Sequence, residues 1–267
     1  MSRSFCHHLN KDHGKASILF LHHLFASHVE FDNVTHLLTD YHLMLVDLPR
    51  HSQPSEALPF GLESVAEDLA ELIREQSKTS RAHLVGMSFG GFIALELAKR
   101  HPELVDSVFV TGAVPLEGWR RSLAKRSFML YVEYGLASFV KLCPDWLYYH
   151  ISAWVGAESS DELRAEMNKN FSLDLLRQGY TAMLKFTADD MATISVRTLL
   201  VAASALDDVD ATRRMGRLLR HQNPESRAAV VKGYIHTWNL RFPELFAGTL
   251  TAWADNTDLP DDMEQLV

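Results

Sequence analysis

The chain has few cysteines, little glycine and no long apolar run. Of its 267 residues only two are cysteines and 13 are glycines. Two cysteines provide no disulfide framework, so a reducing cytoplasm is the expected compartment. No apolar segment approaches the roughly 20 residues that cross a bilayer, and the opening MSRSFCHHLNKDHGK lacks the apolar stretch of a secretory signal. The sequence therefore predicts a cytoplasmic protein without a membrane span.

Positive charge is also scarce. There are 26 Lys and Arg against 34 Asp and Glu, a formal net charge of -8. Because attraction to phosphates needs a basic surface, this balance disfavours nucleic acid as a partner. Fourteen histidines are present, but they form no HExxH motif and no Cys/His cluster with zinc spacing, so we expect neither a metal nor another cofactor.

Short apolar runs alternate with helical patterns in the first 111 residues and again after residue 197. The clearest helical pattern is Leu62–Ile73, whose apolar residues recur at i, i+3, i+4 and i+7. This alternation predicts an α/β fold, with a parallel sheet covered by helices on both faces. The expected strands are Ser17–His22, His42–Asp47, Ala82–Met87, Val105–Val110, Thr198–Ala203 and Ala228–Lys232, and further helices are expected over Phe89–Arg100, Ala211–His221 and Pro243–Ala254.

Residues 113–192 contain no convincing strand and are expected to form a helical cap. The core domain would then comprise 1–112 and 193–267, and the acidic stretch 255–267 would be a loosely held tail. The helices expected within the cap are Ser122–Tyr134, Ala137–Val155, Glu162–Asn168 and Leu173–Phe186.

The cap is rich in aromatic residues. It holds 12 of the 26 aromatics of the chain, and an apolar cap over a reactive group favours a hydrophobic substrate. The candidates for lining the substrate pocket are His23, Trp146, Tyr149 and Trp238.

The most specific motif is Gly86-Met87-Ser88-Phe89-Gly90, between an expected strand and an expected helix. A nucleophile on a sharp strand-to-helix turn needs neighbours without side chains that would collide. The N–H of Phe89, at the start of the helix, would be a natural hydrogen-bond donor to an oxyanion. The pattern predicts that Ser88 is a nucleophile.

A serine hydroxyl needs a base, and the base needs an acid that orients it. His236 lies just after the last expected strand, in Gly233–Asn239. Asp207 follows the strand Thr198–Ala203 at the same edge of the sheet and is the preferred acid. Asp208 is its main rival, and Glu117 is a weaker alternative. The order Ser, Asp, His matches the order expected for such a hydrolase.

These motifs resemble those of the α/β-hydrolase superfamily over almost the whole chain. Leu21–Ser27 resembles the family's His-Gly-x oxyanion loop, and Asp47–Ser52 resembles its D-L-P-G-H-G segment. His236–Leu240, with Pro243–Phe246, is similar to its catalytic-histidine loop and last helix. The resemblance implies the α/β-hydrolase fold, a mostly parallel sheet flanked by helices, with the helical cap inserted after the sixth strand.

The resemblance also implies that the backbone N–H groups of Leu24 and Phe89 form the oxyanion hole. The sequence departs from the family pattern at His23, Arg50 and Ser52, where glycine is usual. If the oxyanion loop needs a positive φ at position 23, histidine carries a steric cost there.

The expected reaction is hydrolysis of a carboxylic ester or thioester of a hydrophobic acyl substrate through an acyl-enzyme. The same triad could cleave a C–C bond next to a ketone or open a lactone, and some proteins of this fold are ligand receptors. The basic run Trp119–Arg126 is usually just a solvated helix face, but it is also a candidate docking surface for an acyl carrier protein. Polyketide-releasing thiohydrolases and esterases are a subfamily that the chain could resemble.

Overall fold

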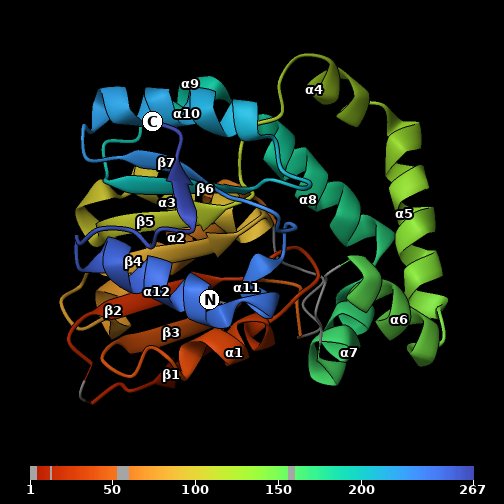
Figure 1. Cartoon of the computed structure of the whole chain (residues 1–267), viewed down its shortest axis with the longest axis horizontal. Helices are drawn as coiled ribbons and strands as arrows, with labels where there is room; N and C mark the ends of the chain where they lie inside the picture. The colour runs from red at the N-terminus through yellow and green to blue at the C-terminus, as the bar shows by residue number, and fades with distance from the viewer. Residues whose placement is uncertain (1–4, 13, 53–59, 156–159) are drawn as a thin grey trace.

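The computed structural model describes residues 5–12, 14–52, 60–155 and 160–267. At its centre lies an eight-stranded sheet in the order β1-β3-β2-β4-β5-β6-β7-β8 (Figure 1). The inner strands pair in parallel, and β1 and β8 pair antiparallel at the two edges. The strands are β1 (Phe5–Leu9), β2 (Ser17–Leu21), β3 (His42–Asp47), β4 (Ala82–Met87), β5 (Val105–Thr111), β6 (Thr198–Ala203), β7 (Arg227–Val231) and β8 (Met263–Gln265).

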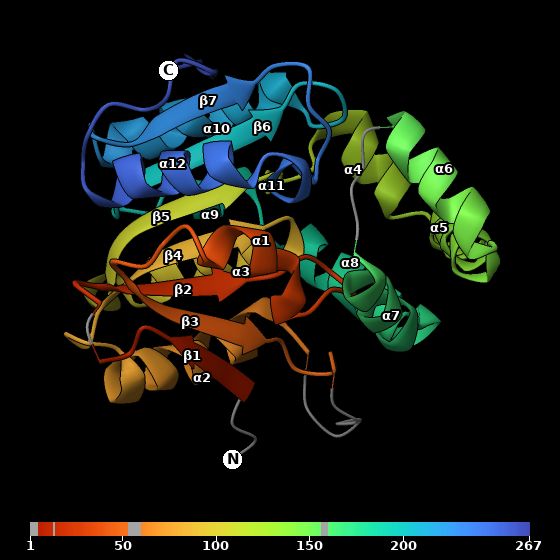
Figure 2. The same ribbon diagram turned by 60° about the horizontal axis from the view of Figure 1, so that its bottom comes forward.

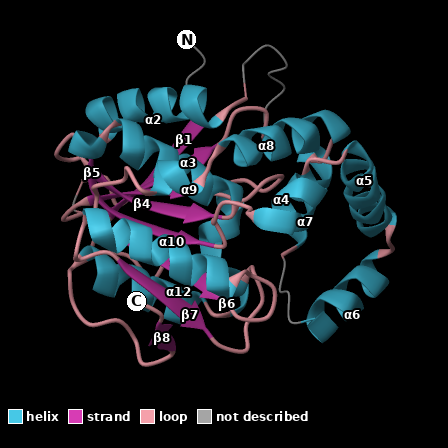
Figure 3. Ribbon diagram, turned by 90° about the horizontal axis from the view of Figure 1, so that it is seen from above, coloured by secondary structure: helices cyan, strands magenta, loops and turns pink. Residues whose placement is uncertain are grey.

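Helices cover both faces of the sheet (Figure 3). Alternate residues of β2 enter two separate cores, Ile18 and Phe20 on one side and Leu19 and Leu21 on the other. The side of Leu19 is covered by α2 (Leu62–Gln76), α3 (Phe89–Arg100) and α10 (Val209–Gln222). The side of Ile18 is covered by α1 (Asp32–Thr35), α11 (Trp238–Arg241) and α12 (Pro243–Ala254), with the 3-10 turn η1 (His28–Phe31) beside them.

A run of helices between β5 and β6 forms an arm beside the sheet (Figure 2). It follows the fifth strand of the described chain, whereas the family resemblance predicted the sixth. The N-terminal segment supplies a single strand, β1, before β2, so one strand fewer precedes the insertion. The helices of the arm are α4 (Gly118–Ala124), α5 (Ser127–Leu142), α6 (Asp145–Val155), α7 (Asp161–Asn170) and α8 (Leu173–Lys185). The short helix α9 (Ala188–Met191) follows and lies against α10 (Figure 1). Within the described ranges, every helix is too short or too polar to cross a bilayer.

Four local features differ from what the sequence predicted. The helix expected over Ser122–Tyr134 is divided at Lys125 and Arg126, between α4 and α5. The single helix expected over Ala137–Val155 is divided, because Pro144 cannot continue the hydrogen-bond ladder and separates α5 from α6. The stretch 255–267 is not a loose tail, since β8 pairs with β7 and the Leu266 N–H donates to the Ala228 carbonyl at 2.7 Å. The edge strand β1 was not expected at all.

Candidate active site

Ser88 lies on a tight turn between β4 and α3. Its backbone has φ 49° and ψ -112°, a region that L residues rarely adopt. Glycines make the turn possible, because a Cβ on Gly90 would lie 2.1 Å from the Leu21 carbonyl oxygen and one on Gly86 would lie 2.6 Å from that of Gly90. The Ser88 N–H donates to the carbonyl of Thr111, at the end of β5, at 2.9 Å. These contacts hold Ser88 at the carboxyl edge of the sheet.

His236 follows β7 and reaches the same edge. Its Nδ1 donates to Asp207 Oδ1 at 2.6 Å. The ring lies against Gly112, where a Cβ would come within 2.2 Å of the ring carbon Cε1. Gly112 follows Thr111, whose carbonyl accepts the Ser88 N–H, so His236 and Ser88 both lie at the end of β5. Among the described residues, Ser88 Oγ makes no hydrogen bond. A contact between Ser88 Oγ and His236 is therefore part of the mechanism proposed below and not an observation.

The candidate acids differ in what they bind. Asp207 accepts the bond from His236, whereas Asp208 caps α10 by accepting the Ala211 N–H at 2.9 Å. The other Asp208 oxygen lies 3.0 Å from Arg120 Nη1. Glu117 Oε2 lies 2.8 Å from Nη2 of Arg214 in α10. The geometry therefore favours Asp207 over both rivals as the partner of the histidine.

The pKa of His236 is raised above the usual value of 6.5. Burial of the ring lowers the pKa, but the hydrogen bond that His236 donates to Asp207 and the negative charge of Asp207 outweigh burial and stabilise the imidazolium. A base with this environment accepts a proton readily, which suits the histidine of a serine hydrolase.

The loop after β2 carries the expected oxyanion donor. In the described part of the chain, neither the Leu24 N–H nor the Phe89 N–H donates to another residue. The positive φ in this loop falls at Phe25 (75°), not at His23 where the steric cost was considered. His23 instead donates its N–H to Glu30 Oε2 at 2.8 Å, and its Nδ1 lies 2.9 Å from the same oxygen. The fully buried Glu30 therefore fixes the start of the loop.

Two buried histidines fix the rest of the loop. His22 Nε2 accepts the Leu48 N–H, and His51 Nε2 accepts the Phe25 N–H, both at 3.0 Å. Their Nδ1 atoms face carbonyl oxygens of His23 and Pro49, so both rings are neutral with the proton on Nδ1. Burial lowers the pKa of His22 well below 6.5 and that of His51 to about 4.

We expect the protein to lose stability as the pH falls below about 6.5. The unfolded chain binds protons at the ordinary histidine pKa of about 6.5, whereas the folded chain binds one at His51 only near 4. For His51 alone, the free energy of unfolding should fall by about 3 kcal/mol between these limits. Urea denaturation at pH 7.5 to 5.5 measures the slope, and His51→Gln should flatten it.

The control is His36→Gln, which removes an exposed histidine. This variant should keep the pH slope of the original chain. An unchanged slope in His51→Gln would show that His51 is not the neutral buried group described above.

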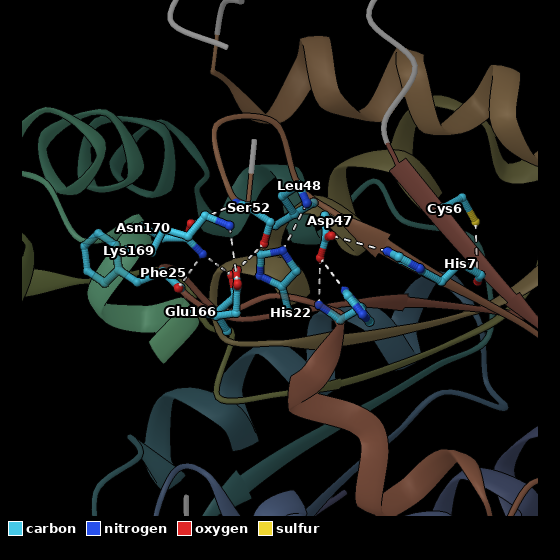
Figure 4. Close-up of polar contacts among 12 residues, drawn as sticks. Cys6, His7, His22, Phe25, Asp47, Leu48, Ser52, Glu166, Lys169 and Asn170 are labelled. Carbon is cyan, nitrogen blue, oxygen red and sulfur yellow. Dashed lines mark hydrogen bonds and ion pairs between the residues drawn. The ribbon is translucent and has the colours of Figure 1, made fainter. Parts of the chain in front are cut away.

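Asn170, at the end of α7, joins the arm to the loops that follow β2 and β3 (Figure 4). Its Nδ2 donates to the carbonyls of Phe25 and Ala26 at 3.0 and 2.9 Å, and its Oδ1 accepts the Ser52 N–H at 2.8 Å. Ser52 Oγ also donates to Glu166 Oε2 at 2.6 Å. We call this set of contacts the arm latch. No sequence motif pointed to Asn170 or Glu166, since their partners lie more than 100 positions away along the chain.

At two positions where the family usually has glycine, this chain has other residues but still adopts the left-handed backbone that favours glycine. Arg50 has φ 67° and Ser52 has φ 59°. A left-handed backbone costs a non-glycine residue roughly 1–2 kcal/mol. The side chains contact the arm, because Arg50 Nη2 lies 2.8 Å from Asp174 Oδ2 in α8 and Ser52 belongs to the arm latch.

Two of the pocket candidates lie at opposite extremes of exposure. Trp238 is fully buried in the core, where its Nε1 donates to Thr111 Oγ1 at 3.0 Å. Trp146 is 72% exposed on α6. Aromatic residues of a cap can pack or face solvent as well as line a pocket, and composition does not distinguish these cases. The Tyr149 hydroxyl donates to Asp161, so its polar end is bound within the arm.

A cavity of about 680 Å³ lies away from the triad. It lies between α2, α3 and α8, and Ser88, Asp207 and His236 are not among its lining residues. It approaches the elbow only through Phe60, whose ring stacks on that of Phe89 at 5.0 Å. The candidate triad therefore does not open into this cavity.

Among the described residues, one cluster of side chains of the kinds that bind metal ions lies beside β1 (Figure 4). The candidate ligand atoms of His7, His28 and Asp47 lie within 4.8 Å of one another. Asp47 Oδ1 already accepts the His28 N–H and Nδ1 at 2.8 and 2.9 Å, so this set is satisfied by hydrogen bonds. Beside it, burial raises the pKa of the Cys6 thiol to about 12, which leaves the thiol protonated.

Comparisons with known proteins agree with this geometry. The sequence pattern of the alpha/beta hydrolase fold matches residues 16–179. An AB hydrolase superfamily protein of Gibberella zeae is 30% identical over 94% of this chain and 84% of its own length. A pimeloyl-[acyl-carrier protein] methyl ester esterase of Neisseria meningitidis is 36% identical over 32% of this chain and 26% of its own. The solved structure of a thermophilic esterase from Thermogutta terrifontis superposes with a TM-score of 0.69 at 16% identity, covering 94% of this chain and 93% of that one.

Proposed function

Because the chain belongs to the alpha/beta hydrolase family, we propose that it is a serine hydrolase that cleaves a carboxylic ester or thioester of a hydrophobic acyl group. The observation that carries the proposal is the 2.6 Å hydrogen bond between His236 and Asp207, beside the strained elbow of Ser88. The arrangement supplies a nucleophile position, a base with a raised pKa and an acid that fixes its tautomer.

In the proposed mechanism Ser88 Oγ attacks the carbonyl carbon and its proton passes to His236 Nε2. The N–H groups of Leu24 and Phe89 bind the oxyanion. His236 then gives the proton to the leaving alcohol or thiol, and an acyl-enzyme remains. A water molecule, deprotonated by His236, attacks the acyl-enzyme and releases the acid, with Ser88 Oγ regaining the proton.

Apolar contacts between the arm and the loop after β2 support the proposal of a hydrophobic acyl group. The Phe25 and Phe171 rings pack edge to face at 5.1 Å, next to the oxyanion loop. Gly179 of α8 lies so close to Leu24 that a Cβ would come within 2.9 Å of its side-chain carbons. Hydrocarbon groups therefore pack beside the proposed oxyanion donor, and a hydrophobic acyl group would be compatible with them.

An acyl carrier protein is proposed as a partner only through the basic run 119–126. Two of its arginines are engaged within the chain, since Arg120 pairs with Asp208 and Arg121 Nη2 donates to the Leu184 carbonyl. Docking would therefore depend mainly on Lys125 and Arg126, both exposed.

A fluorophosphonate probe and a substrate panel test the proposal. We expect the probe to label Ser88, located by peptide mass spectrometry, and p-nitrophenyl esters of medium chain length to be hydrolysed. Acyl-thioesters on a small thiol and on a carrier protein test the partner, with Lys125→Glu/Arg126→Glu as the variant. Turnover of lactones or 1,3-diketones alone would replace ester cleavage by the alternative reactions, and binding without labelling or turnover would indicate a receptor.

A further inference from the structure

Exposed apolar side chains are concentrated in one part of the arm. Of the 13 large apolar residues exposed in the described chain, ten lie between Trp119 and Ile151. Most of these belong to α5, which forms the outer edge of the molecule (Figure 1). Contiguous apolar surface of this kind on a folded protein marks an interaction site.

The exposed residues of α5 follow a helical repeat. They recur at spacings of three and four, so they form one continuous stripe along the helix. The stripe consists of Phe128, Tyr131, Val132, Gly135, Leu136, Phe139 and Val140, and it continues to Leu142. We call it the α5 stripe. A surface helix normally turns such a stripe toward the core, but here the stripe faces outward.

The charged residues of α5 lie away from the stripe. Lys141 Nζ donates to the carbonyl of Asn168, behind the helix, and Glu133 contacts Tyr180 of α8. The opposite face packs inward, with Tyr134 stacked on Phe171 at 5.0 Å. The α5 stripe is therefore uncharged along its whole length. A helix that binds a lipid surface carries many Lys and Arg on its polar face, whereas α5 itself has one, Lys141, whose Nζ is bound to the Asn168 carbonyl.

The size of the stripe suits a helix-to-helix interface. Its side chains expose roughly half to four-fifths of their surface, which amounts to about 700 Å² per copy when aromatics contribute up to about 200 Å² each. Two copies would then bury about 1,400 Å², within the range of specific protein interfaces. An uncharged apolar face meets no like-charge repulsion when it pairs with itself.

The middle of the stripe is complementary to itself. Gly135 has nothing within 4 Å of the place of a Cβ, so it leaves an open notch in an exposed helix. Phe139, one turn further on, is 65% exposed. In an antiparallel pair centred level with residue 137, the Phe139 ring of each copy faces the Gly135 notch of the other. A glycine within an exposed helix otherwise costs about 1 kcal/mol relative to alanine.

We propose that the protein forms a symmetric homodimer in which the α5 stripes of two copies pack antiparallel, with Phe139 of each copy in the Gly135 notch of the other. The interface is isologous and closes at two copies. It buries the largest apolar surface of the arm and joins the two molecules at the edges away from their sheets.

Sedimentation equilibrium across 1–100 µM tests the proposal. We expect the original chain to approach twice its mass of 30.2 kDa. Phe139→Glu should weaken the dimer at least about 30-fold, because a charge then enters the centre of the interface. Leu37→Glu alters an exposed leucine outside the arm and should leave the dimer unchanged. A chain that stays monomeric at 100 µM, or a Phe139→Glu variant that stays dimeric, overturns the proposal.

A size exchange tests the packing itself. Gly135→Leu adds apolar surface and has free space in the single molecule, yet it should weaken the dimer about 10-fold because the notch is filled. Combining it with Phe139→Ala should restore part of the affinity. If Gly135→Leu strengthens association, the contact is non-specific and the proposed pairing is wrong. If the chain is monomeric and α5 variants abolish its co-sedimentation with phosphatidylcholine–phosphatidylserine vesicles, the occupant is a lipid surface and the dimer is excluded.

Discussion

Replacing Ser88 by alanine is expected to lower kcat for a p-nitrophenyl ester by about 10⁴- to 10⁶-fold, because no acyl-enzyme can form without the hydroxyl. The residual rate would come from substrate binding and oxyanion stabilisation alone. The melting temperature should change little, since alanine keeps the Cβ and Ser88 Oγ makes no hydrogen bond within the described chain. Single-turnover kinetics and intact-protein mass after fluorophosphonate treatment measure the effect.

The matched control is Ser107→Ala, a buried serine on β5 whose hydroxyl pairs with His83 rather than with the candidate site. It should reduce stability without removing probe labelling. Activity of Ser88→Ala within tenfold of the original chain would rule out Ser88 as the nucleophile.

Asp207→Asn is expected to lower kcat/KM by about 10⁴-fold, since the amide no longer stabilises the imidazolium and favours the wrong tautomer of His236. The pH profile gives a second measurement. In the original chain, kcat/KM should fall as the pH drops through the pKa of His236, which lies above 6.5. In Asp207→Asn burial still lowers the pKa of His236 and only the charge of Glu30 opposes it, so the inflection should move to lower pH.

Asp208→Asn provides the paired control. Asparagine is as good a helix cap as aspartate, so α10 should keep its start and stability should be nearly unchanged. Activity should stay within about threefold, with an unshifted pH profile. If Asp208→Asn shows the larger loss, the acid has been assigned to the wrong residue.

The elbow was predictable because its determinants are local. Gly86, Ser88 and Gly90 are neighbours in the sequence, and the strand and helix on either side were predicted with the bounds that the structure has. The preference for Asp207 rested on its place after a strand, and the hydrogen bond to His236 gives it geometric support. A buried parallel strand is recognisable from composition, since both faces need apolar residues.

The rest of the site depends on contacts that sequence spacing does not encode. His51 was visible only as part of a family segment, and nothing indicated that its ring would accept the Phe25 N–H. Asn170 contacts its partners because the folding of the arm brings the end of α7 to the loops after β2 and β3. Edge strands such as β8 are short and carry acidic residues, so they lack the apolar pattern that identifies a strand.

The left-handed backbone at Arg50 and Ser52 links the shape of one loop to the position of α7 and α8. Glycine would hold this shape unaided, whereas these two residues are held in it partly by Asp174, Glu166 and Asn170. Lifting α7 away would free the loop to relax, and it would also release the carbonyls after Leu24 that Asn170 binds. Admission of a substrate by such a movement would therefore disturb the loop proposed to bind the oxyanion, and re-closure over the bound molecule would be needed to restore its shape.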